Sequence, residues 1–371
     1  MILIDNPTQS GLLTMPECVD ALERAFGAID SGQAIYRPKT DVNVPNSKTN
    51  EYYRFGSMEG WFDGIFAIRF MSEVMTFDRR PDGSWREGQY SVESGKNCAV
   101  VMLFSSENGE PLALLNDNWI QHMRVGGTAG LGTKILARDD AETVCMIGSG
   151  GMAQTFLEGV CVVRPIKRVR VYSPSADNRK AYAALMSERL GIPVEAVDSG
   201  QAAMAGADIV ATCTNSGTPV FEADWLEPGM HVVCVGTNEV PPDAVPRFDV
   251  SVRQGIHSMA PGGAPGEESE RHRAGVGLSY AGFVAGSEEE MARIPEGGAA
   301  HIDSSAFPKY IDIVAGRESG RTSDEQISFY YCHGNQGLQF AAVGGAIYRN
   351  AVAAGKGTPM PLDWFVQDQK L

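Results

Sequence analysis

The stretch TVCMIGSGGMA, residues Thr143–Ala153, decides the fold. Its first part, Thr143–Ile147, is an apolar run of β-formers, typical of a strand buried on both faces of a parallel sheet. The remainder fits the pattern G-x-G-x-x-G/A. Gly148 permits the tight turn, Gly150 lets a pyrophosphate approach the backbone, and Ala153 lets the next helix pack closely. The N–H groups at the start of that helix would bind phosphate. A tight strand–helix turn without a ligand is the alternative.

Strands alternate with helices around this turn. The predicted helices are Met152–Val163, Ser175–Leu190 (closed by Gly191) and Gln201–Gly206. The predicted strands are Lys167–Tyr172, Val194–Val197, Ile209–Cys213, His231–Val235 and Val250–Val252. Such alternation predicts an α/β fold with a doubly wound parallel sheet, in which ligands bind at the carboxyl ends of the strands. In this context the dinucleotide interpretation is favoured.

The bulk properties are those of a soluble globular protein. The chain has 371 residues, enough for two domains, with 43% apolar and 21% charged residues. No apolar run approaches the roughly 20 residues of a membrane span. The start of the chain lacks the pattern of a secretory signal. The net charge of -15 argues against a general affinity for nucleic acid or anionic membranes.

The cysteines and histidines predict neither disulfides nor a metal site. The seven cysteines, without C-x-x-C or zinc-type spacing, are Cys18, Cys98, Cys145, Cys161, Cys213, Cys234 and Cys332. We expect reduced, buried thiols in a cytoplasmic protein. The six histidines form no ligand pattern, so no metal is expected.

The amino-terminal third has a different character. A helix is predicted at Pro16–Ser31, stopped by Gly32. The predicted strands are Ala34–Pro45, Glu51–Met58, Gly64–Phe70, Ala99–Phe104 and Pro111–Leu115. Thr76–Tyr90 is polar and is predicted to form an exposed hairpin or loop, and Asn108-Gly109 is a strong hairpin signal. We expect a mostly antiparallel sheet with a helix.

The segments that flank the nucleotide-binding region are less regular. Asn118–Arg138 predicts a long helix that contains Gly126, Gly127, Gly130 and Gly132. Since each glycine costs about 1 kcal/mol in a helix interior, we expect close packing of another helix or a ligand there. Beyond the region, Ser258–Arg273 predicts an exposed loop, Ile327–Cys332 a strand, and Gln336–Ala354 a helix that returns to the first domain.

Several motifs together resemble one known family. They are GEPLALLND (Gly109–Asp117), IQHMRVGGTAG (Ile120–Gly130), the Gly148–Ala153 turn, ADIVATCTNSGTPV (Ala207–Val220) and LEPGMHVVCVGTNE (Leu226–Glu239). The set is similar to the ornithine cyclodeaminase/mu-crystallin family over nearly the whole chain.

The resemblance implies a homodimer in which the sheets of the two subunits pair. It implies a Rossmann domain at residues 121–317 and a substrate-binding and dimerisation domain built from residues 1–120 and 318–371. Family activities include ornithine cyclodeamination, imine reduction and amino-acid dehydrogenation. Their shared chemistry is hydride exchange between nicotinamide and the carbon–nitrogen bond beside a carboxylate.

Carried over from the family, Arg124 occupies the position of an arginine that contacts the substrate carboxylate. A planar guanidinium suits bidentate carboxylate binding, although an arginine solvated at a helix surface is the alternative. In the family's P-x-R stretch, which helps to hold the same carboxylate, this chain offers Arg37 and Lys39. Either residue could equally be an exposed strand charge.

Two departures concern proton transfer. The family's pocket lysine falls on Arg69, which stays protonated and so can hold an anion but not cycle a proton. The acidic residue of the cyclodeaminases aligns with Asn238, which can orient an amine but not accept its proton. Lys96 and Glu239 are possible substitutes, with a surface lysine and a turn carboxylate as the alternatives.

The resemblance also implies the cofactor contacts. They are Gly148, Ser149, Gly150, Gly151, Met152, Ala153, Thr212, Thr214, Asn215 and Gly236. At the end of the second strand, Ser173, Ser175 and Arg179 stand where NAD-preferring folds place an acidic residue. Hydroxyls and a cation suit a 2′-phosphate and favour NADP over NAD, unless Ser175 only caps the following helix.

Three functions follow, in order of preference. The first is an NAD(P)-dependent oxidoreductase that reduces a small imino or keto acid or oxidises the matching amino acid. The second is a cyclodeaminase of the ornithine or lysine type that recycles bound NAD. The third is a binding protein that retains the nucleotide site without turnover.

Overall fold

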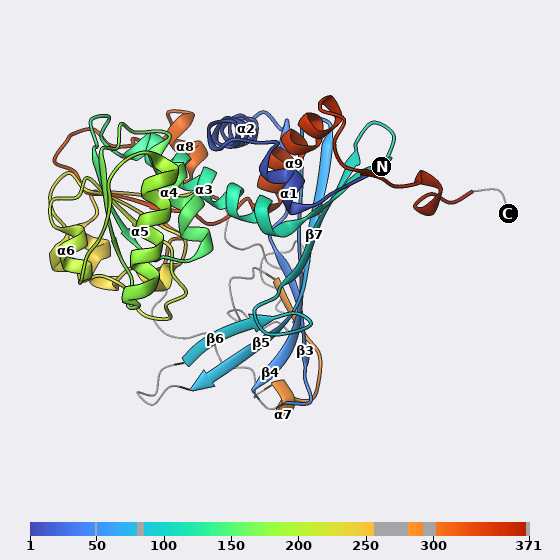
Figure 1. Ribbon diagram of the computed structural model, residues 1–371, viewed down its shortest axis with the longest axis horizontal. Coiled ribbons are helices and arrows are strands. Elements are labelled where there is room, and N and C mark those ends of the chain that lie inside the picture. The colour runs from blue at the N-terminus through green and yellow to red at the C-terminus, as the bar shows by residue number, and fades with distance from the viewer. Residues whose placement is uncertain (49, 80–84, 256–280, 292–301, 369–371) are drawn as a thin grey trace.

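Two sheets, joined by packed helices, make up the protein (Figure 1). The computed structural model describes residues 1–48, 50–79, 85–255, 281–291 and 302–368. Figure 1 shows α2 (Met15–Gly27), α3 (Asp117–Leu136) and α9 (Gln336–Ala353) between the two sheets. The α/β fold class predicted from the glycine-rich stretch is confirmed.

The first sheet is parallel and has seven strands among the described residues. Their order is β11 (Val194–Ala196), β10 (Arg168–Tyr172), β9 (Thr143–Ile147), β12 (Ile209–Thr212), β13 (His231–Cys234), β16 (Ser328–Tyr331) and β14 (Val250–Arg253). All five residues of β9 are buried, as predicted for a central strand. The strand order reverses between β9 and β12, so the glycine-rich turn after β9 lies at a topological switch point.

Three α-helices of this half lie close to the predicted ranges, and three short 3-10 helices were not predicted. They are α4 (Gly151–Cys161), α5 (Ala176–Leu190) and α6 (Gly200–Met204), with the 3-10 helices η1 (Ala223–Trp225), η2 (Thr237–Glu239) and η3 (Pro242–Arg247). The two ends of α5 show why its range could be predicted from the sequence. The Ser175 hydroxyl accepts a bond from the Asn178 N–H, and Gly191 ends the helix with φ of 68°.

The second sheet is mixed and, in the described ranges, has ten strands. Its main path is β15 (Ala281–Val284), β3 (Thr40–Pro45), β4 (Glu51–Phe62), β5 (Ile65–Arg79), β7 (Cys98–Ser105), β8 (Pro111–Asn116), β1 (Ile2–Ile4) and β17 (Thr358–Pro359). In addition, β2 (Ala34–Tyr36) pairs with β4 and β6 (Trp85–Tyr90) pairs with β5. The predicted polar excursion therefore contains the antiparallel pairing of β5 with β6, and its residues 80–84 lie outside the described part of the chain. The remaining helices are α1 (Asn6–Ser10), α7 (Glu288–Met291), α8 (Tyr310–Val314) and the 3-10 helix η4 (Leu362–Trp364).

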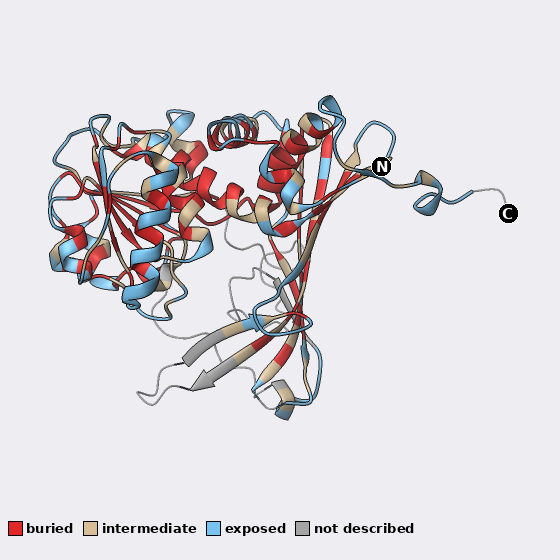
Figure 2. Ribbon diagram, in the orientation of Figure 1, coloured by how far each residue is buried: buried red, intermediate tan, exposed pale blue. Residues whose placement is uncertain are grey.

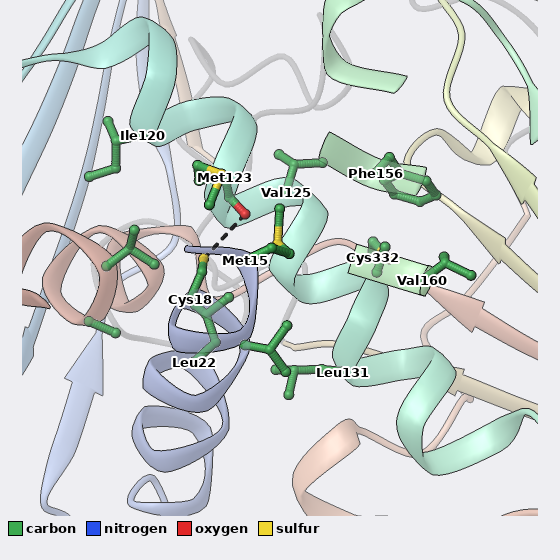
Figure 3. Packing of buried hydrophobic residues seen from close by; sticks show 14 of the residues in the cluster. Met15, Cys18, Leu22, Ile120, Met123, Val125, Leu131, Phe156, Val160 and Cys332 are labelled. Carbon is green, nitrogen blue, oxygen red and sulfur yellow. Dashed lines mark hydrogen bonds between the residues drawn. The ribbon is translucent and has the colours of Figure 1, made fainter. Parts of the chain in front are cut away.

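The glycines of α3 mark contacts with its neighbours. A Cβ at Gly126 would lie 2.1 Å from the Thr155 carbonyl oxygen of α4, and one at Gly127 would lie 2.6 Å from Leu22 of α2. A Cβ at Gly132 would lie 2.1 Å from the Tyr330 ring of β16. Figure 3 shows α2 and α3 in contact, where the Cys18 thiol donates a hydrogen bond to the Met123 carbonyl oxygen. Close packing of neighbouring helices and of β16, rather than a ligand, thus explains these glycines.

The chain passes between the sheets more than once. β15 pairs with β3 in the mixed sheet, although it follows β14 in sequence. β16 then enters the parallel sheet between β13 and β14, and α9 returns to pack on β4 and β5. The domain boundaries expected at residues 120 and 318 stay a prediction. β15 lies within the range expected for the Rossmann domain but pairs in the mixed sheet, whereas β16 lies within the range expected for the other domain but joins the parallel sheet. Figure 2 shows α3 and the parallel strands as the most continuously buried parts.

Some local expectations need correction. Helix α2 ends at Gly27 rather than Ser31, because Ala28 already caps it, and Gly32 lies in a later turn with φ of 71°. The predicted strand 34–45 is broken into β2 and β3. Cys98 is exposed, whereas the other six cysteines are buried or half-buried, and all seven are free thiols. The predicted loop Ser258–Arg273 lies outside the described residues.

Neither a membrane-spanning helix nor a metal cluster is found in the part of the chain that the structure describes. Within the described residues, no helix combines the length and apolar character needed to cross a bilayer. In the same part of the chain, His, Cys, Asp and Glu side chains form no cluster of three or more that could hold a metal ion.

Candidate functional site

The glycine-rich turn has the backbone geometry that a diphosphate requires. Gly148 has φ of 120°, and a Cβ there would lie 2.3 Å from the Cys213 carbonyl oxygen, so only glycine fits. Gly150, the N-cap of α4, is exposed, and a Cβ built on it would meet nothing within 4 Å. No side chain caps the helix among the described residues. The N–H groups of its first turn therefore have no capping side chain, and such groups can bind an anion.

The residues around the turn support its shape. Ala153 is fully buried, and its carbonyl oxygen accepts a 2.7 Å bond from the Tyr182 hydroxyl. The Ser149 and Ser173 hydroxyls lie 2.8 Å apart and so join the ends of β9 and β10. Gly151 and Met152 begin α4, where Gly151 is exposed and Met152 half-buried.

The cation predicted to bind a 2′-phosphate is already paired. Arg179 is buried, and its guanidinium donates bonds of 3.2 Å to the Ser173 carbonyl oxygen and 2.6 Å to the Asp198 carboxylate. It also lies over the Tyr172 ring, 5.9 Å from the centroid. Ser175 caps α5, as the alternative interpretation stated. Contacts within the protein thus hold the Arg179 guanidinium at the end of β10, and the Asp198 carboxylate partly neutralises its charge.

Glu239 organises the loops after β12 and β13. Its carboxylate accepts bonds from the Thr212 hydroxyl at 3.1 Å, the Thr214 N–H at 2.5 Å and the Gly236 N–H at 2.9 Å. Burial raises the pKa of this carboxyl group, and the three donors oppose the rise. Glu239 therefore holds together the two loops that are predicted to contact the cofactor. This role is closer to the turn-carboxylate alternative than to that of a proton carrier.

Asn238 and Asn215 also lie on these loops. Asn238 follows β13 in η2, and its buried Oδ1 has no hydrogen-bond partner among the described residues. A buried amide oxygen without a donor loses free energy, so a ligand N–H is a suitable partner. Asn215, after β12, is exposed.

Arg124 is held in a buried position. It is only 8% exposed, which excludes the alternative of an arginine solvated at the helix surface. Its guanidinium donates to the Gln121 side chain at 2.9 and 3.2 Å and to the Gln339 side chain at 3.0 Å. It lies 5.4 Å from the centroid of the Phe340 ring. Residues of α3 and α9 thus fix its orientation.

Arg69 lies over the same ring. Its guanidinium is 5.7 Å from the Phe340 centroid and pairs with both oxygens of Asp117, at 3.1 and 2.8 Å. Its Nη1 lies 2.8 Å from the Met71 sulfur, which is a weak acceptor. A carboxylate would be a stronger partner for this N–H group. Two buried guanidinium groups therefore share one aromatic ring.

Arg37 and Lys39 lie on opposite faces of the mixed sheet. The register pairs Tyr36 with Gly60 but Thr40 with Ser57, so one extra residue, a β-bulge, separates β2 from β3. Arg37 is exposed and forms an ion pair with Glu59.

Lys39 takes the inner face instead. Without a bulge, residues two apart would share a face. The structure thus brings Lys39, but not Arg37, to the buried side that carries Arg69.

Lys39 has the properties of a proton carrier. It is 5% exposed, and its Nζ lies 3.0 Å from Asp41 Oδ2. Burial, aided by Arg54, lowers the pKa of Lys39 to about 8, although Asp41 opposes the shift; Arg69 lowers it slightly further. An amine with this pKa exchanges protons readily near neutral pH.

Lys39 lies close to Arg69 through shared neighbours. A Cβ on Gly56 would lie 3.3 Å from Lys39 Cε and 3.1 Å from Met71 Cγ, and Met71 contacts Arg69. Lys96, by contrast, is 67% exposed and pairs with Glu93 on the turn after β6.

Sequence reasoning missed several members of the site. Asp117 lies in the quoted LLND motif and could have been identified as a partner for a buried cation. Gln339 lies 215 residues from Arg124, so no local signal connects the two. His122 lies beside the glycine-rich turn, where a Cβ on Gly151 would be 3.2 Å from its Cε1.

Comparison with known proteins identifies a family that this chain matches. Residues 85–353 match the model of the ornithine cyclodeaminase/mu-crystallin family. A protein of Rhizobium meliloti that carries a dehydrogenase name is 31% identical over 92% of this chain and 93% of its own length. A Delta(1)-pyrroline-2-carboxylate reductase of Bacillus cereus is 30% identical over 70% of this chain and 72% of its own length.

A solved structure resembles the whole molecule. Thermococcus litoralis Delta(1)-pyrroline-2-carboxylate reductase, in complex with NADH and L-proline, has a TM-score of 0.72 at 25% identity. The match covers 97% of this chain and 100% of that one.

Proposed function

Because this chain belongs to the ornithine cyclodeaminase/mu-crystallin family, we propose that it is an NAD(P)-dependent oxidoreductase. It acts on the carbon–nitrogen bond of a small imino or amino acid, as an imine reductase or an amino-acid dehydrogenase. The names of the relatives and the NADH and L-proline of the solved reductase support this reaction class.

One turn of α3 carries the proposal. Its His122 lies against Gly151 of the glycine-rich turn, and its Arg124 lies over Phe340 beside Arg69. A carboxylate anchor and a residue in contact with the turn that a dinucleotide would occupy therefore lie within one turn of the same helix. Such proximity is what transfer between two bound molecules requires.

The residues at the edge of the parallel sheet fit a dinucleotide. Gly148 and Gly150 leave the backbone open for a diphosphate, and the Asn238 amide oxygen lacks a donor. When bound, a nicotinamide dinucleotide supplies or accepts the hydride.

The other side chains have separate tasks in this proposal. Arg124 and the Nη1 of Arg69 bind the substrate carboxylate, and Asp117 fixes the plane of the Arg69 guanidinium. The ammonium group of Lys39 gives a proton to the imine nitrogen as the adjacent carbon gains hydride. In the oxidative direction the neutral amine of Lys39 takes the proton back.

A substrate screen tests this function. Purified protein is mixed with NADH or NADPH and cyclic imino acids, or 2-oxo acids with ammonia or methylamine, and absorbance at the nicotinamide wavelength is followed. Amino acids with the oxidised cofactors test the reverse reaction. Turnover with one pair supports the proposal. Tight cofactor binding without turnover across the panel would instead indicate a binding protein.

Cyclodeamination is the second candidate, because Lys39 is a buried amine that can act as a base. In this candidate Lys39, rather than Lys96 or Glu239, activates the attacking amine. Ammonia release from ornithine or lysine without net consumption of added cofactor would favour it.

A preference for NADP is a further part of the proposal. The hydroxyls of Ser173 and Ser175 and the guanidinium of Arg179 support it, whereas the bond between Arg179 and Asp198 reduces the positive charge available. Fluorescence titration with NADH and NADPH decides the matter, since a tighter dissociation constant for NADH would contradict the preference.

The outer face of the mixed sheet supports a homodimer. Val42, Val44, Phe55 and Phe66 are 36 to 39% exposed, and Ile68 lies on the same face of β5 as Phe66. Apolar side chains over one face of several strands indicate a surface that another sheet covers. We propose a second copy of the chain as that partner. Sedimentation analysis should show a dimer that an Ile68→Lys variant weakens, and a monomeric wild type would refute this assignment.

The location in the cell completes the proposal. All seven cysteines are free thiols, which supports the expected cytoplasmic location. Cell fractionation with an antibody against the protein tests it.

A further inference from the structure

His122 is a titratable group that the proposed reaction does not use. It lies in the first half of α3 and is half-buried. Within the described residues, neither nitrogen of its imidazole has a recorded hydrogen-bond partner. An imidazole carries one donor and one acceptor when neutral and two donors when protonated. The ring therefore has donor capacity that the folded chain leaves unused.

The ring lies beside the start of α4. A Cβ on Gly151 would be 3.2 Å from His122 Cε1 and 3.9 Å from Nδ1, so the absence of a side chain there allows this approach. Gly151 is the first residue of α4, and Gly150, its N-cap, borders open space. The imidazole thus stands beside the N–H groups that are expected to bind the diphosphate.

The two helices hold this position firmly. The Thr155 hydroxyl of α4 donates a 2.8 Å bond to the His122 carbonyl oxygen. A Cβ on Gly159 of α4 would lie 1.8 Å from the Gly126 carbonyl oxygen, so the backbones of the helices are in contact. These contacts fix the backbone of His122 beside α4.

The surroundings of the ring favour its neutral form when no ligand is bound. Burial lowers the pKa of His122; Asp117 on the same helix opposes this effect and Arg124 adds to it. The first turn of α4 carries no acidic residue that would stabilise the protonated ring. A diphosphate beside the ring would supply the missing negative charge.

We propose that His122 donates a hydrogen bond to the diphosphate of the bound dinucleotide, and that dinucleotide binding is coupled to proton uptake by this imidazole. The proposal rests on the proposed function. Since binding raises the proton affinity of the ring, the dinucleotide binds more tightly at lower pH. A rise of one pKa unit corresponds to about a tenfold change in affinity across the titration.

Titration calorimetry with ADP-ribose, which has the diphosphate but no nicotinamide, tests this coupling. Runs between pH 5.5 and 8.5 in two buffers of different ionisation enthalpy count the protons taken up. We expect net proton uptake and a dissociation constant that weakens on the order of tenfold toward pH 8.5. A His122→Gln variant should lose both effects and bind at pH 5.5 as weakly as the wild type does at pH 8.5.

A Lys134→Gln variant is the matched control. It removes a positive charge from the same helix about 18 Å from His122 along the axis, and it should leave the coupling intact. A wild type that binds ADP-ribose without proton uptake would overturn the proposal, as would a folded His122→Gln variant with unchanged coupling. If His122→Gln does not fold, proton uptake by the wild type and by a His122→Asn variant decides. Failure of NADH and NADPH to bind the wild type at any pH would instead refute the proposed function.

Discussion

Replacement of Lys39 by arginine should remove one limb of the pH–rate profile. With a pKa of about 8, Lys39 is about nine-tenths protonated at pH 7, half at pH 8 and one-tenth at pH 9. Reduction of an imine consumes the protonated form, so the rate should fall about tenfold for each pH unit well above 8.

The Lys39→Arg variant keeps the cation beside Asp41 but does not titrate in this range. Loss of the proton donor should lower kcat by roughly 10²- to 10⁴-fold and abolish the limb near pH 8.

The assay is the initial rate of NAD(P)H oxidation with the best imino acid of the screen, from pH 6 to 10. Thermal unfolding of each variant establishes that the fold is intact. Lys96→Arg is the matched control, because Lys96 is exposed and paired with Glu93, and its profile should equal that of the wild type. An unchanged limb and a kcat within about twofold in Lys39→Arg would refute the assigned role.

Four further predictions follow from the contacts described. Gly159→Ala should lower stability: overpacking costs about 1–3 kcal/mol or more, against about 1 kcal/mol gained in helix propensity, and an unchanged melting temperature would contradict the close helix contact. Gly150→Ala, where a Cβ meets nothing, should change stability by less than about 1 kcal/mol yet weaken cofactor binding, as equilibrium titration can show. Arg124→Lys should raise KM for the carboxylate substrate about 10- to 100-fold while the cofactor dissociation constant stays unchanged, and the opposite pattern would place Arg124 elsewhere. Burial holds the pKa of His231 well below its usual range, so below about pH 6.5 only the unfolded chain gains this proton. The free energy of unfolding should then fall by up to about 1.4 kcal/mol per pH unit, and this fall, measured by denaturant unfolding at several pH values, should be smaller in His231→Gln.

The sequence predicts the parts of the molecule that depend on local chemistry. Thr143–Ala153 combines a buried strand, a glycine with positive φ and a helix start within eleven residues, so its sequence pattern is sufficient to predict the strand–turn–helix unit. The caps of α5 are equally local. Arg124 could be placed on its helix, and the resemblance suggested its role.

The substrate side of the site depends on tertiary structure. No sequence pattern shows that a bulge between Tyr36 and Thr40 sends Arg37 outward and Lys39 inward, because the bulge appears only in strand pairing. Gln339 reaches Arg124 only after α9 has returned to the mixed sheet. The sequence could not favour Lys39 over Lys96 as the proposed proton carrier, since burial lowers the pKa of Lys39 and burial depends on the complete fold.

The late arrival of β16 affects how the nascent polypeptide can mature. β14 pairs only with β16 among the described strands, and β16 also completes the edge of β13. Until the ribosome has made Ser328–Tyr331, both strands keep unpaired amide and carbonyl groups, which are prone to association with other chains. A fragment spanning residues 121–317 would expose the same unfinished edges permanently. The nucleotide-binding half is therefore expected to require the carboxyl-terminal segment for solubility, and autonomous expression of that half should yield aggregates.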